Sequence, residues 1–376
     1  MRVVAASALL FPVLLAACGA DRATAPIESS LAPAVAVRAL SGATSIEVLP
    51  QDAGSLIRAD ARGLNAAGQV TGAQYGLTPY TEEFRPYRST SGSPAVALEE
   101  CCNAQWGADI NDAGVIVGAT QSTVVAGRRG FVAVGTSIVA LPILADGDAQ
   151  LSAAAVAVNN AGQIVGFSPS ATGRHAVLWK TASTIEDLGT LGGSASEAID
   201  INGSGTVIGT SLISGDAAWH FFLWSAAAGM QDLNTRLGAD VTSVVEINDA
   251  GQIIGTFTTT SGESHAFLYT PGAGLRDLGT LGGTASAPTG LNNAGQVVGS
   301  STVADGSAHA FVWTPTDGMD DITAVSGIRT VRRLNDKLQT LAGPVATPAA
   351  LPGFATSGDP LLVQLNFTPT SQQTTR

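Results

Sequence analysis

A nine-residue box recurs seven times along this chain and constrains its fold more than any other feature. The box reads hydrophobic, Asn, two variable residues, Gly, one variable residue, two hydrophobic residues and Gly. We call it the Asn box. Its first copy, Leu64 to Gly72, has Thr71 at a hydrophobic position, and the seventh, from Leu334, has lost the box glycine. The box asparagines are Asn65, Asn111, Asn159, Asn202, Asn248, Asn292 and Asn335.

The chemistry of the box predicts a tight connection between two strands. An Asn side chain accepts a hydrogen bond from backbone two residues further on, and the glycine that follows can take a positive φ. The apolar residues on either side then form paired strands. Successive asparagines lie 43 to 48 residues apart, a period typical of one four-stranded propeller blade per repeat.

A second box follows the Asn box in four of the repeats. It begins with His and ends with Trp or Tyr, as in His175-Ala-Val-Leu-Trp179. Alternate residues of a strand face opposite sides, so both faces of this strand are largely apolar. That pattern suits a sheet packed between two neighbouring sheets. The box histidines are His175, His220, His265 and His309, which are all the histidines of the chain.

An aspartate follows each of these histidines twelve residues later. These residues are Asp187, Asp232, Asp277 and Asp321. Two copies continue as Asp-Leu-Gly-Thr-Leu-Gly-Gly, and the spacing allows a His–Asp hydrogen bond between neighbouring strands of one blade. The first two repeats lack both residues; their weak equivalents of the His box run through 84–87 and 130–134.

The ends of the repeat region suggest how the array closes. Ile46–Pro50 and Leu361–Phe367 fall at equivalent positions of the repeat, as expected when strands from both termini complete a shared blade. We therefore predict an all-β domain over residues 44–370, a β-propeller of seven four-stranded blades. An open array of β-repeats is the alternative, but it would need capped terminal edges that the sequence does not suggest.

The three boxes together resemble the HAF family of extracellular bacterial repeats. The resemblance covers about residues 45–367 and is strongest over 156–322. It implies export and a repeated β architecture, and it implies no catalytic residue.

The N-terminus is similar to a bacterial lipoprotein signal. Arg2 precedes a short apolar run, and Leu15-Ala-Ala-Cys18 matches a lipobox. The run is too short to span a bilayer, so we expect removal of residues 1–17, lipidation of Cys18, and a tether over 18–43. Gly19 resembles outer-membrane sorting, which places the domain at the outer membrane or cell surface. The alternative is an ordinary secretory signal in which Cys18 is incidental.

Two further cysteines are adjacent, Cys101 and Cys102. Free neighbouring thiols persist poorly in an oxidising compartment, which favours a vicinal disulfide despite its strained geometry. Two reduced thiols, or thiol ligation of a metal, are the alternatives.

The net charge of −12 argues against one class of partner. An acidic chain without a basic cluster cannot neutralise phosphates, so we expect no nucleic acid. We expect a monomer attached to the membrane through its lipid, with a protein or glycan ligand and no cofactor.

The repeated His and Asp residues could have either a chemical role, in metal binding or catalysis, or a structural role. A ring of imidazoles could bind a metal, but equivalent positions on neighbouring blades lie too far apart for one ion. No nucleophile recurs in a recognisable elbow, so we assign these residues a structural role and predict no catalytic or metal-binding residue. Trp106 and Trp219 lie outside the repeat register and are the candidates for a ligand surface.

Two functions follow from these observations. The favoured one is a non-catalytic cell-surface module that binds or scaffolds an extracellular protein, glycan or envelope component. The alternative is a secreted propeller hydrolase or lyase acting on polysaccharide, which needs carboxylates converging at the channel mouth. The irregular segments 75–93, 99–106 and 144–150 are where we expect residues unique to a site.

Overall fold

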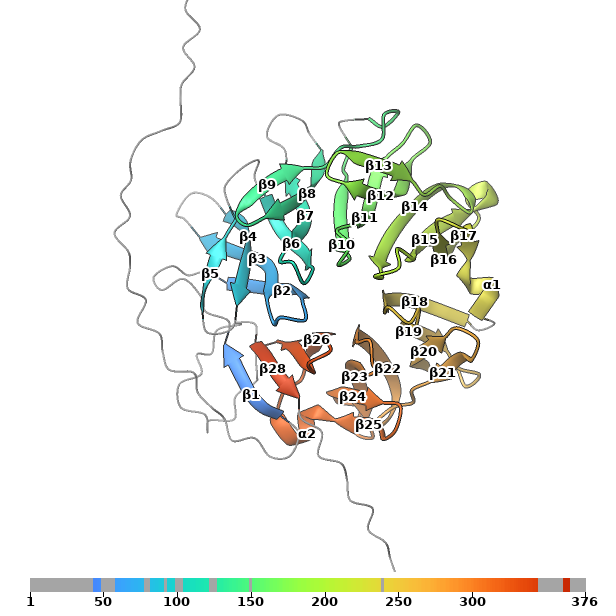
Figure 1. Cartoon of the computed structure of the whole chain (residues 1–376). Coiled ribbons are helices and arrows are strands. Elements are labelled where there is room, and N and C mark those ends of the chain that lie inside the picture. The colour runs from blue at the N-terminus through green and yellow to red at the C-terminus, as the bar shows by residue number, and fades with distance from the viewer. Residues whose placement is uncertain are drawn as a thin grey trace, which may run out of the picture. The chain divides into compact units, whose positions relative to one another are not determined.

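The first strand of each repeat ends at its Asn box, and the box turns the chain into the second strand (Figure 1). The computed structural model describes residues 43–48, 58–77, 82–90, 93–98, 104–121, 127–148, 151–237, 240–343 and 361–365. These residues belong to one unit, Pro33–Arg376.

Four of the sheets are four-stranded, antiparallel and formed from consecutive strands. The first two contain β2 (Arg58–Leu64), β3 (Val70–Leu77), β4 (Glu82–Thr90) and β5 (Ser93–Ala97), then β6 (Ala104–Ile110), β7 (Ile116–Gln121), β8 (Arg128–Val134) and β9 (Ser137–Ala140). The next two contain β10 (Ala154–Val158), β11 (Ile164–Pro169), β12 (Arg174–Thr181) and β13 (Thr184–Asp187), then β14 (Gly192–Ile201), β15 (Val207–Ile213), β16 (Trp219–Ser225) and β17 (Gly229–Asp232).

An eight-stranded sheet follows, in which a parallel pairing of Ser264 with Ala285 joins two consecutive repeats. It contains β18 (Asp240–Ile247), β19 (Ile253–Thr258), β20 (Ser264–Thr270), β21 (Gly274–Asp277), β22 (Gly282–Leu291), β23 (Val297–Val303), β24 (Ala308–Thr314) and β25 (Gly318–Asp321). The last sheet has the order β1 (Ala43–Val48), β28 (Leu361–Leu365), β27 (Gln339–Ala342) and β26 (Val331–Leu334). The short helices are η1 (Ser214–Asp216), α1 (Leu233–Leu237) and α2 (Ile322–Ser326).

Strands from both ends of the chain share the last sheet. β1 pairs antiparallel with β28, from Val48 opposite Leu361 to Ala43 opposite Leu365, which confirms that terminal strands complete one sheet. The prediction that the two terminal segments occupy the same position of the repeat is wrong. β28 also pairs with β27 and is therefore the third strand of its sheet, whereas β1 is the outermost strand.

The predicted fold class is confirmed: the chain is an all-β propeller, with its first strands around a common centre (Figure 1). Seven blades remain a prediction, which the division of the eight-stranded sheet into two repeats supports. Within the described residues, no helix is long and apolar enough to cross a membrane.

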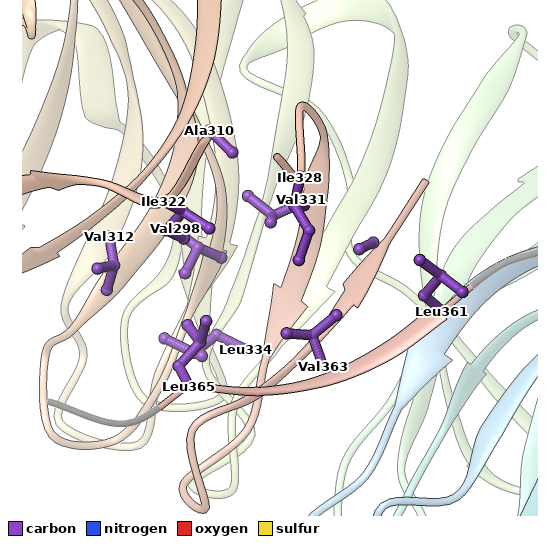
Figure 2. Packing of buried hydrophobic residues seen from close by; sticks show 11 residues of the cluster. Val298, Ala310, Val312, Ile322, Ile328, Val331, Leu334, Leu361, Val363 and Leu365 are labelled. Atoms are coloured by element: carbon purple, nitrogen blue, oxygen red, sulfur yellow. The ribbon is translucent and has the colours of Figure 1, made fainter. Parts of the chain in front are cut away.

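The hydrophobic core lies between neighbouring sheets. In the cluster shown in Figure 2, Val298 and Val312 of β23 and β24 pack with Val331 and Val363 of the last sheet. The His-box strand is buried on both faces; in β12, for example, Val177 and Leu178 point to opposite sides and both are buried. Each sheet therefore depends on both neighbours for its stability.

Candidate functional site

The seven box asparagines form a closed cycle of hydrogen bonds at the centre of the propeller. Each Nδ2 donates to the backbone carbonyl oxygen of the next box Asn, at 2.9–3.0 Å in six cases. The bond from Asn292 to Asn335 is 3.5 Å long. Each Oδ1 accepts from its own turn, as Asn65 does from the N–H groups of Ala67 and Gln69. The same side chain thus shapes a hairpin and joins neighbouring repeats.

A cavity of about 180 Å³ opens at this ring of asparagines. All seven repeats contribute to its wall, through the Asn boxes and the residues just before them. We call this cavity the channel mouth. Among the described residues, its charged lining consists of six carboxyl groups and one guanidinium: Asp109, Asp112, Asp200, Glu246, Asp249, Asp336 and Arg333.

The residue two places before each box Asn is charged in four repeats and is Gly or Ala in the other three. In chain order these residues, the inner column, are Gly63, Asp109, Ala157, Asp200, Glu246, Gly290 and Arg333. Each of the three acids accepts a hydrogen bond from a backbone N–H of the following repeat. The acceptors and donors are Asp109 Oδ2 from Val158 at 3.0 Å, Asp200 Oδ2 from Ile247 at 2.9 Å, and Glu246 Oε2 from Leu291 at 2.9 Å.

Arg333 is the cation of the inner column. Its Nη1 lies 3.3 Å from Glu246 Oε1, and its Nε donates to the carbonyl oxygen of Arg62 at 3.0 Å. Its φ of 55° is left-handed, an uncommon conformation for a residue with a side chain. This conformation occurs where the pairing of β26 with β27 shifts register between Arg332 and Leu334.

Burial dominates the titration of the inner column. Burial, together with the nearby Glu246 carboxylate, raises the pKa of Asp200 to about 8. Burial likewise raises the pKa values of Asp109 and Glu246, with Arg333 opposing the rise in each case. For Arg333, burial opposes the charged form, but the three carboxylates outweigh it and raise the guanidinium pKa. The mouth therefore stabilises positive charge and disfavours further negative charge.

A second column lies one place after each box Asn and is more exposed. Asp112, Asp249 and Asp336 accept hydrogen bonds from backbone N–H groups of the preceding repeat, at 2.7–2.8 Å. Asn293 donates its Nδ2 to both Asp249 and Asp336 and so connects these two acids, whereas Asn160 donates its Nδ2 to Asp112. We call these five residues the outer column.

Metal binding finds no support in the part of the chain that the structure describes. No group of three or more His, Cys, Asp or Glu side chains there could hold a metal ion. The three acids of the inner column therefore do not form such a group, although they line one cavity.

The structure places each box His beside its Asp within a single sheet. The Nδ1 to carboxylate distances are 2.8 Å for His175–Asp187, 2.7 Å for His220–Asp232, 2.9 Å for His265–Asp277 and 2.7 Å for His309–Asp321. The other Asp oxygen accepts an N–H from the following turn, as Asp187 does from Gly189 at 2.8 Å. None of these residues lines the channel mouth, so the structure does not bring the four imidazoles together there.

The two tryptophans outside the repeat register lie in different sheets. The ring of Trp106 faces the guanidinium groups of Arg62 and Arg128, at 5.4 and 4.9 Å from its centroid. Trp219 is half exposed on β16. Cys18, Cys101 and Cys102 lie outside the described residues.

Sequence reasoning missed the inner column. We expected a site in the irregular segments of the first two repeats, but the described lining of the cavity comes from the Asn boxes themselves. The available signal was a variable position within a regular repeat: Asp109, Asp200, Glu246 and Arg333 place charge where the other copies have Gly or Ala.

A β-propeller with an acidic channel mouth is the class of protein that this geometry defines. No family model and no curated protein matches the chain. A puromycin-hydrolyzing peptidase of Mycobacterium tuberculosis is similar over 76% of this chain and 50% of its own, with a TM-score of 0.52 and 12% identity. The β-propeller domain of the Trilobed protease from Pyrococcus furiosus has a TM-score of 0.49 and 9% identity over 71% of this chain and 82% of its own. TolB from Acinetobacter baumannii has a TM-score of 0.40 and 11% identity over 82% and 79%. At these identities the likeness is one of fold alone.

Proposed function

We propose that this chain is an HAF-repeat lipoprotein of the cell surface whose propeller binds an extracellular protein or envelope component without catalysing a reaction. In this proposal the ligand presents positive charge to the channel mouth. The observation that carries it is the described lining of that cavity, which contains six carboxyl groups and one guanidinium. Such a wall attracts cations and repels anionic polymers.

The outer column supplies the first contacts in this proposal. Asp112, Asp249 and Asp336 are exposed, and backbone N–H groups already hold one oxygen of each carboxylate. Pre-oriented carboxylates lose little side-chain entropy on binding. Lysine or arginine side chains of a protein fit this arrangement better than a neutral glycan does.

A short oligolysine peptide tests the proposal, titrated against the exported domain by fluorescence anisotropy at low and high salt. Binding should weaken with salt, and the D112N/D249N/D336N variant should bind about tenfold less tightly, because each exposed charge pair contributes about 0.2–1 kcal/mol. The matched control is D240N/D305N/D320N, which removes equal charge outside the channel mouth. An equal loss in the control, or no peptide binding, would overturn the proposal, as would binding of neutral glycans that the mouth variant leaves unchanged.

One observation favours the alternative of a polysaccharide hydrolase or lyase. Asp200, with its pKa raised to about 8, shares the cavity with Glu246. Glycoside hydrolases use a protonated carboxyl group as general acid together with a second carboxyl group. Release of reducing ends from a cationic polysaccharide such as chitosan, abolished in Asp200→Asn, would establish this alternative. Turnover that D200N leaves unchanged would exclude this role for Asp200.

A further inference from the structure

Among the described residues, the seam between the last sheet and the first has a small apolar contact. The last sheet and the first, β2–β5, share a cluster of four buried residues among those described, namely Ala61, Val70, Leu341 and Leu362. On its other side, the last sheet shares a cluster of eleven buried residues with its neighbour (Figure 2). Apolar burial is the main stabilising term between sheets, and among the described residues it is smaller at the seam than at the opposite junction.

Among the residues that the structure describes, three polar contacts cross this seam. Asn335 Nδ2 donates to the carbonyl oxygen of Asn65 at 2.9 Å, as the other repeats do. Arg333 Nε donates to the carbonyl oxygen of Arg62 at 3.0 Å. Arg332, largely exposed, lies 3.8 Å from Asp60. The Arg333 contact comes from the inner column, where no other repeat has a cation.

Arg333 also faces charges from three other repeats. Its guanidinium contacts Glu246 of β18, and its charge opposes the raised pKa values of Asp109 of β6 and Glu246. Asp200 of β14 completes the inner column. The outer carboxylates Asp112, Asp249 and Asp336 line the same cavity. Within the described lining, the Arg333 guanidinium is the single positive charge among six carboxyl groups.

We propose that Arg333 is an electrostatic lock: it holds the seam between the first and last sheets closed by neutralising carboxylates that the other repeats direct into the channel. The lock is needed most when those carboxylates are ionised. Acidification protonates the carboxyl groups with raised pKa values first, so the repulsion that Arg333 offsets falls as the pH falls. The proposal does not depend on whether the channel mouth binds a ligand.

Hydrogen–deuterium exchange of the exported domain tests the lock at about pH 9 and about pH 5, corrected for intrinsic rates. In Arg333→Gln, amides of Val331–Ala342 and Arg58–Leu64 should exchange at least about tenfold faster at the higher pH, with a much smaller effect at the lower pH. Amides of Ala154–Asp232, far from the seam, should be unaffected. Arg236→Gln, which removes an exposed arginine of α1 away from the seam, is the matched control and should behave as the parent.

Two further variants keep the test decisive if Arg333→Gln fails to fold. Arg333→Lys keeps the charge and should keep the seam closed at high pH. Asp200→Asn combined with Arg333→Gln removes one uncompensated carboxylate and should restore part of the lost protection. The proposal is overturned by uniform acceleration in all sheets, by equal effects at both pH values, or by a lysine variant as open as the glutamine variant.

Discussion

Asn335 donates its side-chain amide to the backbone carbonyl oxygen of Asn65, at 2.9 Å and across 270 positions of sequence. This bond closes a cycle that the other six box asparagines make between consecutive repeats. A residue type selected for a local turn therefore also joins the two ends of the array.

Replacing a box asparagine should destabilise the whole domain. Asn159 is buried, and its side chain makes four hydrogen bonds: to Gln163 Oε1, to the carbonyl oxygen of Asn202, and from the N–H groups of Ala161 and Gln163. Asn159→Ala leaves these partners unsatisfied, and we expect a loss of about 2–4 kcal/mol in unfolding free energy, measured by chemical denaturation. Asn160→Ala, at the exposed neighbour, should cost below about 1 kcal/mol. Equal losses in the two variants would contradict a special role for the ring.

The final glycine of the Asn box should tolerate no side chain. A Cβ on Gly166 would lie 1.9 Å from the carbonyl oxygen of Ala154 on the paired strand. Gly166→Ala must displace that strand, and we expect a loss of about 3 kcal/mol or more. At Gly162 of the same box, φ is 79° but nothing lies within 4 Å of a Cβ, so Gly162→Ala should cost only about 1–2 kcal/mol. Thermal unfolding of the two variants side by side distinguishes backbone clash from left-handed strain.

Stability should fall as the pH rises through the neutral range. Asp200 has a folded-state pKa of about 8 against an ordinary value of 3.8, so the folded state binds its proton more tightly than the unfolded state does. The corresponding stability is fully present below the ordinary pKa and is lost as the pH rises toward 8. We expect Asp200→Asn to flatten this dependence by on the order of 1 kcal/mol or more. Denaturation at a series of pH values measures it, and a parent profile parallel to that of D200N would refute the assignment.

The His–Asp pairs should contribute little individually and bind no metal as a set. The His220 and Asp232 side chains are each about one-quarter exposed, and pairs of that kind contribute about 0.2–1 kcal/mol. His220→Gln should therefore lower the unfolding free energy by no more than about 1 kcal/mol. Isothermal titration of the parent with zinc should give no stoichiometric binding. A tight site that is lost in this variant would instead favour the imidazole-ring hypothesis.

Lipidation of Cys18 is testable by fractionation. Cys18→Ala should move the protein from the membrane fraction to the soluble exported fraction, because the acyl chains provide the predicted anchor. Mass spectrometry of the mature N-terminus should find acyl groups in the parent alone. Cys101→Ser is the control and should remain with the membrane. A variant that still partitions with the membrane would show that Cys18 is incidental.

The repeat made much of the fold predictable. Hairpins arise from short-range chemistry, so seven Asn boxes and their spacing predicted the strands, the turns and the terminal strand pairing. The register at the termini could not be predicted in the same way. Leu361–Leu365 becomes the third strand of its sheet because it pairs with β27, and pairing between distant segments is not encoded in a local pattern.

The sequence by itself determined the local units: a turn at each Asn, a doubly buried strand at each His box, and an Asp within reach of each His. Only the tertiary structure decided which positions face one another. Asp109, Asp200, Glu246 and Arg333 are separated by 46 to 91 residues from one to the next, and ring closure brings them to one cavity. Burial, with carboxylate repulsion at Asp200 and Glu246, raises the pKa values of the three acids, and attraction to those carboxylates raises that of Arg333; both effects arise from that assembly. A charged position inside a repeat acquires its chemistry only when the repeats surround a common centre.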